Sequence, residues 1–254
     1  MLIHSARHKP EDLEEYYRLY DRLDAANAEN PRLERIALQA MEDIADFVAS
    51  HDAYIGVSWG KDSVTVADLA MRMGLNIPLV HMTFLPFCTP EHEKVRDAFL
   101  EMWPNAQYHE EVCDYGDIET RGLTDEEQTA AEDPIFKAAW RRVNNNIAPC
   151  HISGVRGVES KVRRIRMHRW GVASKNTLAP IGWWKTEDVY AYIYSRGLPL
   201  HPNYGMIGGG RWDRQYIRVD GLGGKEGARV GRGVWEAEYY QDVLNRLHAG
   251  TKIQ

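Results

Sequence analysis

The stretch Ser58-Trp59-Gly60-Lys61-Asp62-Ser63 combines the residue types of an anion-binding turn. It follows an apolar run at 54–57 and precedes a segment of helical periodicity. A strand that ends in a small-residue turn and feeds a helix directs several backbone N–H groups, and the positive end of the helix dipole, at one point. Gly60 lets an anion approach the backbone, while the serine hydroxyls and the lysine ammonium add donors. These six residues predict a binding site for nucleotide phosphates.

The hexapeptide does not match a Walker A loop, because Asp62 separates Lys61 from Ser63 and no glycine stands five residues before Gly60. It resembles instead the Ser-Gly-Gly-Lys-Asp-Ser loop of the PP-loop ATP pyrophosphatases. That family uses the loop to grip the pyrophosphate of ATP or the phosphates of a related adenine nucleotide. Trp59 stands where the family usually has its first glycine, and we expect its side chain to narrow the mouth of the site. The alternative is a capping turn that binds no ligand.

A second segment, residues 150–169, begins as a short apolar strand and continues into a Gly-x-Arg-Gly turn. It carries basic residues at positions 156, 161, 163, 164, 166 and 169 against one acid, Glu159. Such a cluster indicates either an anionic partner or a solvated basic helix face. The sequence resembles the Gly-Val/Ile/Leu-Arg-x-x-Glu/Gln-Ser-x-x-Arg segment of the phosphoadenosine phosphosulfate (PAPS) reductase branch, with Gly154, Arg156, Glu159, Ser160 and Arg163 in register. The resemblance places these residues at the nucleotide and implies that the two arginines contact phosphate or sulfate.

A third match follows in the expected order. Residues 178–193 and 197–204 are similar to the family's "Pro-Leu-x-x-Trp-x-x-x-Asp-Val-Trp-x-Tyr-Ile" and "Leu-Pro-x-Asn-Pro-Leu-Tyr" segments. The first reads as a helix that Thr186 caps, with Trp184 and Val189 in the core. On these three matches the chain is identified as a member of the PAPS reductase-like, adenine nucleotide alpha hydrolase-like family. The resemblance further implies that the backbone around Met82 and Thr83 reads adenine.

Strand and helix patterns alternate along the chain, which predicts an α/β fold with a doubly wound, mostly parallel sheet and its ligand at the carboxyl ends of the strands. Strands are expected at 54–57, 78–84, 107–112 and 152–155, and helices at 10–26, 31–50, 62–73, 90–102, 125–147, 187–195 and 234–248. We expect an N-terminal helical extension at 1–50, a nucleotide-binding domain at 51–204, and a lid-like segment with a C-terminal helix at 205–254. The N-terminal helices are candidates for a homodimer contact or for docking a partner subunit.

Residues 205–233 hold ten glycines, and six basic residues, Arg211, Arg214, Arg218, Lys225, Arg229 and Arg232, outnumber three acids. A glycine-rich, basic segment suits a lid that closes over a phosphorylated substrate, or else a mobile surface loop.

Composition adds limits. With 254 residues, 44% of them hydrophobic, the chain can bury one substantial core. No stretch reaches the length of a membrane span and no signal peptide opens the sequence, so we expect a cytoplasmic protein. A net charge of −6 argues against a protein built mainly to coat nucleic acid.

The three cysteines, Cys88, Cys113 and Cys150, are too few for a disulfide framework. Classical PAPS reductases carry a C-terminal Glu-Cys-Gly-Leu/Ile-His segment, and no cysteine follows Cys150, so thiol-dependent reduction is not expected. Sulfur-inserting relatives often bind an iron–sulfur cluster through three cysteines. Here Cys150 precedes its strand, away from the other two, and buried inert thiols are the expected outcome.

The chemistry that remains is activation with Mg²⁺ and ATP. An acceptor oxygen would attack the α-phosphorus, and Lys61, Arg156, Arg163 and the metal would stabilise charge on the leaving pyrophosphate. The acceptor could be sulfate or a carbonyl oxygen of a nucleobase or another small molecule. Two alternatives stay open: a non-catalytic adenine-nucleotide-binding protein, and a PP-loop component of a DNA or tRNA sulfur-modification system in which residues 156–169 and the tail hold the polynucleotide.

Overall fold

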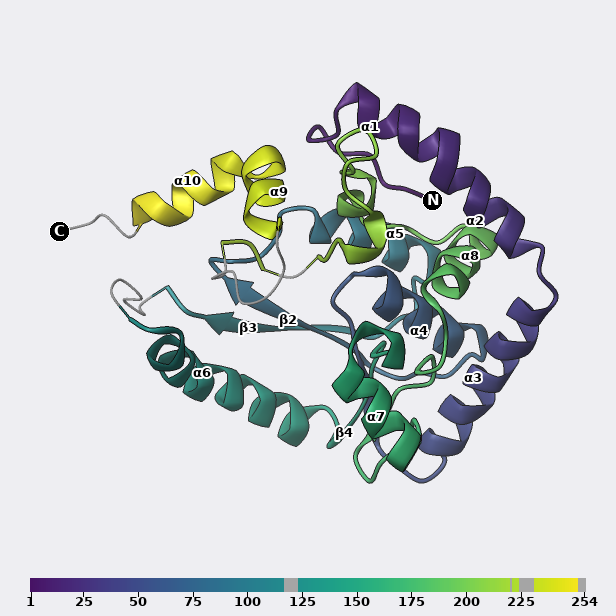
Figure 1. Cartoon of the computed structure of the whole chain (residues 1–254). Coiled ribbons are helices and arrows are strands. Elements are labelled where there is room, and N and C mark those ends of the chain that lie inside the picture. Colours follow the sequence, from purple (N-terminus) through teal and green to yellow (C-terminus); the bar gives the residue numbers. More distant parts are fainter. Residues whose placement is uncertain (117–122, 220, 224–230, 251–254) are drawn as a thin grey trace.

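A five-stranded sheet forms the centre of the computed structural model, which describes residues 1–116, 123–219, 221–223 and 231–250 (Figure 1). Its order is β3-β2-β1-β4-β5, and every pairing is parallel. The strands are β1 (Ala53–Gly56), β2 (Leu79–Leu85), β3 (Tyr108–Asp114), β4 (Cys150–Ile152) and β5 (Thr177–Leu178). The chain therefore runs outward from β1 to β3 and returns to place β4 on the other side of β1, which confirms the predicted parallel α/β fold.

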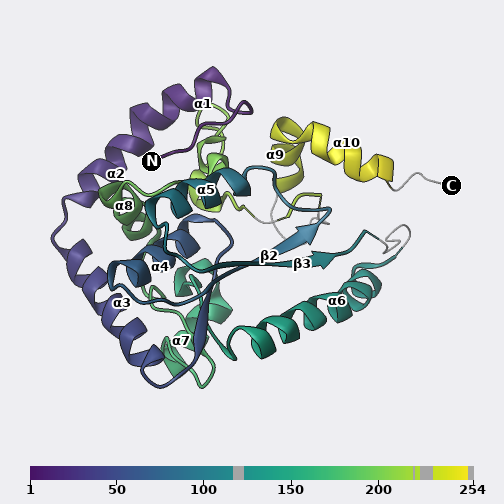
Figure 2. The same ribbon diagram turned by 180° about the vertical axis from the view of Figure 1, so that it is seen from behind.

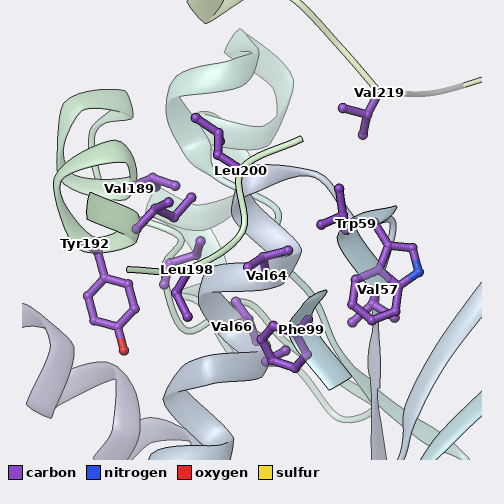
Figure 3. Close-up of a cluster of buried hydrophobic side chains, with 14 of the residues drawn as sticks. Val57, Trp59, Val64, Val66, Phe99, Val189, Tyr192, Leu198, Leu200 and Val219 are labelled. Atoms are coloured by element: carbon purple, nitrogen blue, oxygen red, sulfur yellow. The ribbon is translucent and has the colours of Figure 1, made fainter. Parts of the chain in front are cut away.

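Helices cover both faces of this sheet (Figures 1 and 2). One face packs against the main hydrophobic cluster, whose contributors include α3 (Arg32–Val48), α4 (Lys61–Arg72), α5 (His92–Met102) and α8 (Thr186–Arg196). The long helix α6 (Asp125–Asn146) covers the other face, where Val143 packs with Tyr54 and Val80. The sheet is thus doubly wound, as the sequence predicts. In Figure 3 the main cluster brings Val64 and Val66 of α4 together with Val189 of α8 and Phe99 of α5.

The N-terminal extension packs on the body of the same chain. It comprises α1 (Pro10–Glu15), a π-helical turn (Tyr16–Tyr20) and α2 (Asp21–Ala28), where the sequence predicts one continuous helix. The Ile3 amide donates to the Leu200 carbonyl at 2.9 Å, and Asp24 of α2 forms a buried ion pair with Arg214. Contact with a second subunit through these helices stays a prediction.

The C-terminal part is also packed. It contains 3₁₀ turns at Pro202–Gly205 and Arg214–Tyr216, then α9 (Arg232–Tyr239) and α10 (Gln241–Gly250). Side chains of Met206, Ile207, Ile217 and Val219 are buried. These apolar side chains anchor residues 205–219 on the body, and the role of a lid over a phosphorylated substrate stays a prediction. Lys225 and Arg229 lie outside the described residues.

Two further elements differ from the predictions. Strand β4 covers Cys150–Ile152 rather than 152–155, because it pairs with β1 from Ala53 onward and the chain turns away after the Ser153 amide bonds the Leu178 carbonyl. The second difference is the exposed helix α7 (Lys161–Trp170), which is absent from the predicted helices. It follows a 3₁₀ turn at Gly157–Glu159. In the described part of the chain, no helix has both the length and the apolar composition to cross a membrane.

Acidification from pH 7 to pH 5 is expected to lower the free energy of unfolding through buried histidines. Burial lowers the pKa of His8, His81 and His201 below the ordinary value of 6.5, and His92 and Lys94 lower that of His201 further. The unfolded chain protonates these rings near pH 6.5, whereas the folded protein keeps them neutral to lower pH, so stability is lost as pH falls through that window. Each unit of pKa depression contributes about 1.4 kcal/mol.

The variant His201→Asn isolates one of these groups. The His201 Nδ1 atom accepts a 3.1 Å hydrogen bond from the Asn203 amide, and an asparagine oxygen can replace that acceptor without titrating. Urea unfolding at pH 7 and pH 5 should show a smaller acid-induced loss of stability in this variant than in the wild type. The exposed His109→Asn variant is the control and should lose as much stability between pH 7 and pH 5 as the wild type. If His201→Asn loses as much as well, His201 does not cause the acid-induced loss.

Candidate functional site

The hexapeptide forms a closed turn between β1 and α4. Gly60 is the N-cap of α4, so the helix begins at Lys61 and its first amides face the end of the strand. The Ser58 amide donates to the Ser63 hydroxyl at 3.1 Å, and that hydroxyl donates to the Gly60 carbonyl at 3.0 Å. These bonds fix the loop around the positive end of the helix dipole, the arrangement suited to a phosphate.

Trp59 does not narrow the mouth of the site. Its backbone adopts a φ of +56°, and its side chain is only 1% exposed. The indole packs with Phe99 and Tyr108 at ring-centroid distances of 5.9 and 5.6 Å, inside the main cluster (Figure 3). The left-handed backbone turns this side chain away from the pocket and into the core. The expectation that Trp59 narrows the mouth of the site is therefore wrong.

The second predicted segment meets the first by direct backbone contact. A Cβ atom on Gly154 would lie 2.7 Å from the Asp62 carbonyl carbon, so only glycine fits where the loop after β4 crosses the start of α4. The side-chain carboxylate of Asp62 then bridges the two loops. It accepts from the Lys61 ammonium and from Arg156 Nε, each at 2.6 Å.

Arg156 is buried and fully engaged by protein groups. Its side chain is 2% exposed, and Nη1 reaches the Thr186 hydroxyl at 3.2 Å and the Trp184 carbonyl at 3.4 Å. In this structure Arg156 therefore tethers Asp62. Its direct contact with phosphate or sulfate, which the resemblance implies, stays a prediction.

Arg163 lies at the outer rim of the site. Its guanidinium pairs with Glu159, and its side chain is 44% exposed. Ser160 caps α7 by accepting from the Arg163 amide at 3.1 Å and does not line the pocket described next. Of this segment, Gly154, Arg156, Glu159 and Arg163 do line it.

A pocket of about 380 Å³ lies where the two loops meet, at the carboxyl ends of β1 and β4. These strands are the neighbours at which the sheet order reverses, the usual ligand position in open α/β sheets. From the hexapeptide, the lining includes Ser58, Gly60, Lys61, Asp62 and Ser63. Residues that the sequence analysis did not assign to the site complete the wall: Gly56, Ser153, Val155, Val158, Thr186, Tyr204 and the stretch 215–219.

The stretch 215–219 lies directly against the Ser58–Ser63 turn, the predicted phosphate loop. A Cβ atom on Gly60 would come 2.9 Å from Val219 Cγ2 and 3.3 Å from the Tyr204 hydroxyl. In the sequence, the only signal for this wall is the basic character of the tail, which includes Arg218. The pocket lining contains four cationic residues, Lys61, Arg156, Arg163 and Arg218, against two carboxylates, Asp62 and Glu159, so its charge favours an anion.

Met82 and Thr83 do not belong to this lining. The Thr83 hydroxyl donates to Glu110 at 2.6 Å, and Met82 packs against the Tyr54 and Val80 cluster. The paired register between β1 and β2 ends at Gly56 and Val80, so β2 continues past β1 toward the same edge of the sheet. Adenine recognition by this backbone stays a prediction.

The pocket's donor set suits Mg²⁺ that arrives with a nucleotide. Mg²⁺ is usually held by one or two carboxylates together with substrate phosphates and water, and Asp62 and Glu159 are the carboxylates of the lining. The three cysteines are free thiols at separate places: Cys88 after β2, Cys113 near the end of β3, and Cys150 at the start of β4. No group of three or more metal-ligating side chains is found among the residues described.

Several solved structures are similar to this chain at low sequence identity. A PAPS reductase from Candida auris in a phosphate complex is 12% identical, with 66% of this chain and 87% of that chain covered and a TM-score of 0.49. An NMN synthetase from Francisella tularensis is 14% identical (87% and 97% covered, TM-score 0.48), and a U34-tRNA thiolase from Methanococcus maripaludis is 12% identical (87% and 82% covered, TM-score 0.46).

No curated protein matches the sequence. A family model does match, and it covers the sheet and both loops of the site. Residues 52–207 fit the model of the phosphoadenosine phosphosulfate reductase domain, which is more than half of the chain. By that match, the chain belongs to the phosphoadenosine phosphosulfate reductase domain family.

Proposed function

We propose that this protein binds ATP or a related adenine nucleotide in the pocket and transfers its adenylyl group to an acceptor, with release of pyrophosphate. The observation that carries the proposal is the Ser58–Ser63 turn, closed by its own hydrogen bonds at the N-terminus of α4 and facing a pocket of about 380 Å³ with a cationic lining. Family membership supports a nucleotide as the ligand.

The reaction forms one bond and breaks one. An acceptor oxygen bonds to the α-phosphorus, and the bond from that phosphorus to the bridging oxygen breaks, so its electron pair leaves with pyrophosphate. The amides at the start of α4 and the Lys61 ammonium stabilise the negative charge that grows on this leaving group. Arg163 at the rim adds a further cation. Mg²⁺, when bound with the nucleotide, supplies additional neutralisation of the phosphates.

Arg156 contributes by position. Its guanidinium holds Asp62, and Asp62 in turn holds the Lys61 ammonium at 2.6 Å, so the cation is kept beside the loop before any nucleotide binds. The rings of Tyr190 and Tyr204 lie 5.9 and 5.5 Å from the Lys61 nitrogen and limit its movement. Burial raises the pKa of Tyr190 well above its ordinary value, so this phenol stays neutral and adds no charge.

Nucleotide analysis after incubation with Mg²⁺ and ATP tests the proposal. Reactions are run alone, with sulfate, and with RNA or DNA, and the Lys61→Ala variant is expected to lose at least about 100-fold in AMP or adenylated product. Lys137→Ala, on the exposed face of α6, is the matched control and should react like the wild type. ATP that stays intact under every condition, or that yields ADP and phosphate, would overturn the mechanism.

The burial of Trp59 bears on the binding-only alternative. A tryptophan side chain in the pocket would block the β- and γ-phosphates and so favour binding without turnover, but this side chain lies in the core. The remaining alternative is a component of a DNA or tRNA sulfur-modification system. It requires a surface that binds the polynucleotide, and the basic helix α7 is the candidate for that surface.

A further inference from the structure

Helix α7 (Lys161–Trp170) is exposed along almost its whole length. Met167 is its one buried side chain, and its sulfur packs against Gly157 and Gly182. The helix carries five arginine or lysine residues, and no acidic residue occurs anywhere from 160 to 176. Among these cations only Arg163 has an ion pair within the described part of the chain. Four cations, Lys161, Arg164, Arg166 and Arg169, therefore repel one another on one surface with no described counter-charge.

Large apolar side chains stand on the same surface. Val158, Val162, Ile165, Trp170 and Trp183 are between 47% and 77% exposed. The Trp183 ring lies 4.7 Å from that of His168, and the Arg169 guanidinium lies 4.8 Å from the Trp170 ring. Exposing two tryptophans to water on one surface is unfavourable if that surface contacts only solvent. The composition of this surface is that of a contact site.

The order of these side chains around the helix narrows the partner. At 3.6 residues per turn, Arg166 falls between Val162 and Trp170, and Arg169 falls between Ile165 and Val162. A helix that lies on a membrane separates its apolar face from its charged face, and α7 does not. Cations interleaved with aromatic rings are the pattern that binds single-stranded nucleic acid, since phosphates meet the cations and unpaired bases stack on the rings.

We propose that α7, with Trp183 beside it, binds a single-stranded segment of nucleic acid. Val158, Glu159 and Arg163 belong both to this end of the molecule and to the pocket lining, so the bound strand lies at the pocket rim. A nucleotide of that strand is then the acceptor in the adenylyl transfer, a step that rests on the proposed function. The binding itself does not depend on it.

Fluorescence anisotropy with a labelled single-stranded oligonucleotide, without ATP, tests the binding. The triple variant Arg164→Ala/Arg166→Ala/Arg169→Ala is expected to bind at least about tenfold more weakly and to show a shallower salt dependence, because phosphate contacts are lost. Trp170→Ala should weaken binding about fivefold to 100-fold through lost stacking. The control Arg18→Ala/Arg22→Ala/Arg35→Ala removes the same charge from exposed positions on the N-terminal helices and should bind like the wild type.

Three results would overturn the proposal: equal losses in the α7 and control variants, duplex bound as tightly as single strand, or anionic vesicles bound through α7 in preference to the oligonucleotide. Circular dichroism confirms that each variant is folded. Since none of the substituted residues lines the pocket, ATP turnover is followed separately, and a protein that binds the strand but forms neither AMP nor an adenylated product refutes only the proposed function. Formation of an adenylated strand with pyrophosphate, lost in the triple variant, supports the acceptor assignment, and its absence refutes it.

Discussion

Replacing Asp62 with alanine is expected to lower the free energy of unfolding by about 3–5 kcal/mol, the usual result of removing one partner of a buried ion pair. Asp62 accepts from Lys61 and from Arg156, and the Arg156 side chain is 2% exposed. The variant leaves the buried guanidinium with only the longer, 4.0 Å pair to Glu159. It also frees the Lys61 ammonium from its position beside the phosphate loop, so stabilisation by added ATP should fall as well.

Urea unfolding measures this effect against two comparisons. Asp97→Ala removes a 66% exposed carboxylate paired with Arg96 and should change stability by no more than about 1 kcal/mol. The double variant Asp62→Ala/Arg156→Met removes the buried charge itself and should be more stable than Asp62→Ala alone. A single variant as stable as the wild type, or a double variant less stable than the single one, would show that the pair does not tie the two loops together.

Replacing Asp24 with alanine is expected to have an effect of similar size, again about 3–5 kcal/mol. Arg214 pairs with Asp24 through both terminal nitrogens, with Nη1 at 2.7 Å from Oδ2, and both side chains are 5% exposed. The guanidinium also lies 3.7 Å from the Tyr190 ring centroid and 4.3 Å from that of Tyr20. Loss of the carboxylate leaves this cation enclosed by aromatic rings without a counter-ion.

The functional consequence follows from the position of Arg214, which directly precedes the pocket wall 215–219. Under the proposed function ATP raises the melting temperature, and this thermal shift should decrease in Asp24→Ala. Arg18→Ala, which breaks an exposed pair with Glu15, is the control and should unfold like the wild type. If Asp24→Ala is destabilised but keeps the full thermal shift with ATP, the Asp24–Arg214 pair does not support the pocket wall.

The sheet, its parallel pairing and the phosphate turn follow from the sequence because each rests on a local pattern. The apolar run at 54–57 leads into a polar turn and then a periodic helix, and the structure has these elements in that order. Strand β5 is only two residues long, Thr177–Leu178, and so leaves no period to detect. The π-helical turn at Tyr16–Tyr20 preserves helical periodicity closely enough that its pattern reads as one helix.

The site was harder to predict where side-chain direction decides the outcome. Trp59 belongs to the hexapeptide, but a single φ of +56° sends its ring into the core. Arg156 matches the family segment, yet tertiary burial turns it toward Asp62. The wall 215–219 follows the last matched segment in sequence and reaches the phosphate loop only through long-range packing. The residue types were enough to predict an anion-binding site. Which side chains face the pocket depends on contacts between residues far apart in the sequence.

The attachment of the N-terminal residues to the end of the chain has a consequence for biosynthesis. Ile3 bonds Leu200, Arg7 pairs with Asp242, Asp12 accepts from the Tyr239 hydroxyl, and Asp24 pairs with Arg214. A ribosome releases the N-terminal segment first, so these contacts form only after residues 200 to 242 have been synthesised. The wall 215–219 arrives in the same late interval. A nascent chain that stops short of α9 therefore lacks the Asp242 partner of Arg7 and the Tyr239 partner of Asp12, and the N-terminal helices are fully anchored only after Asp242 has been added.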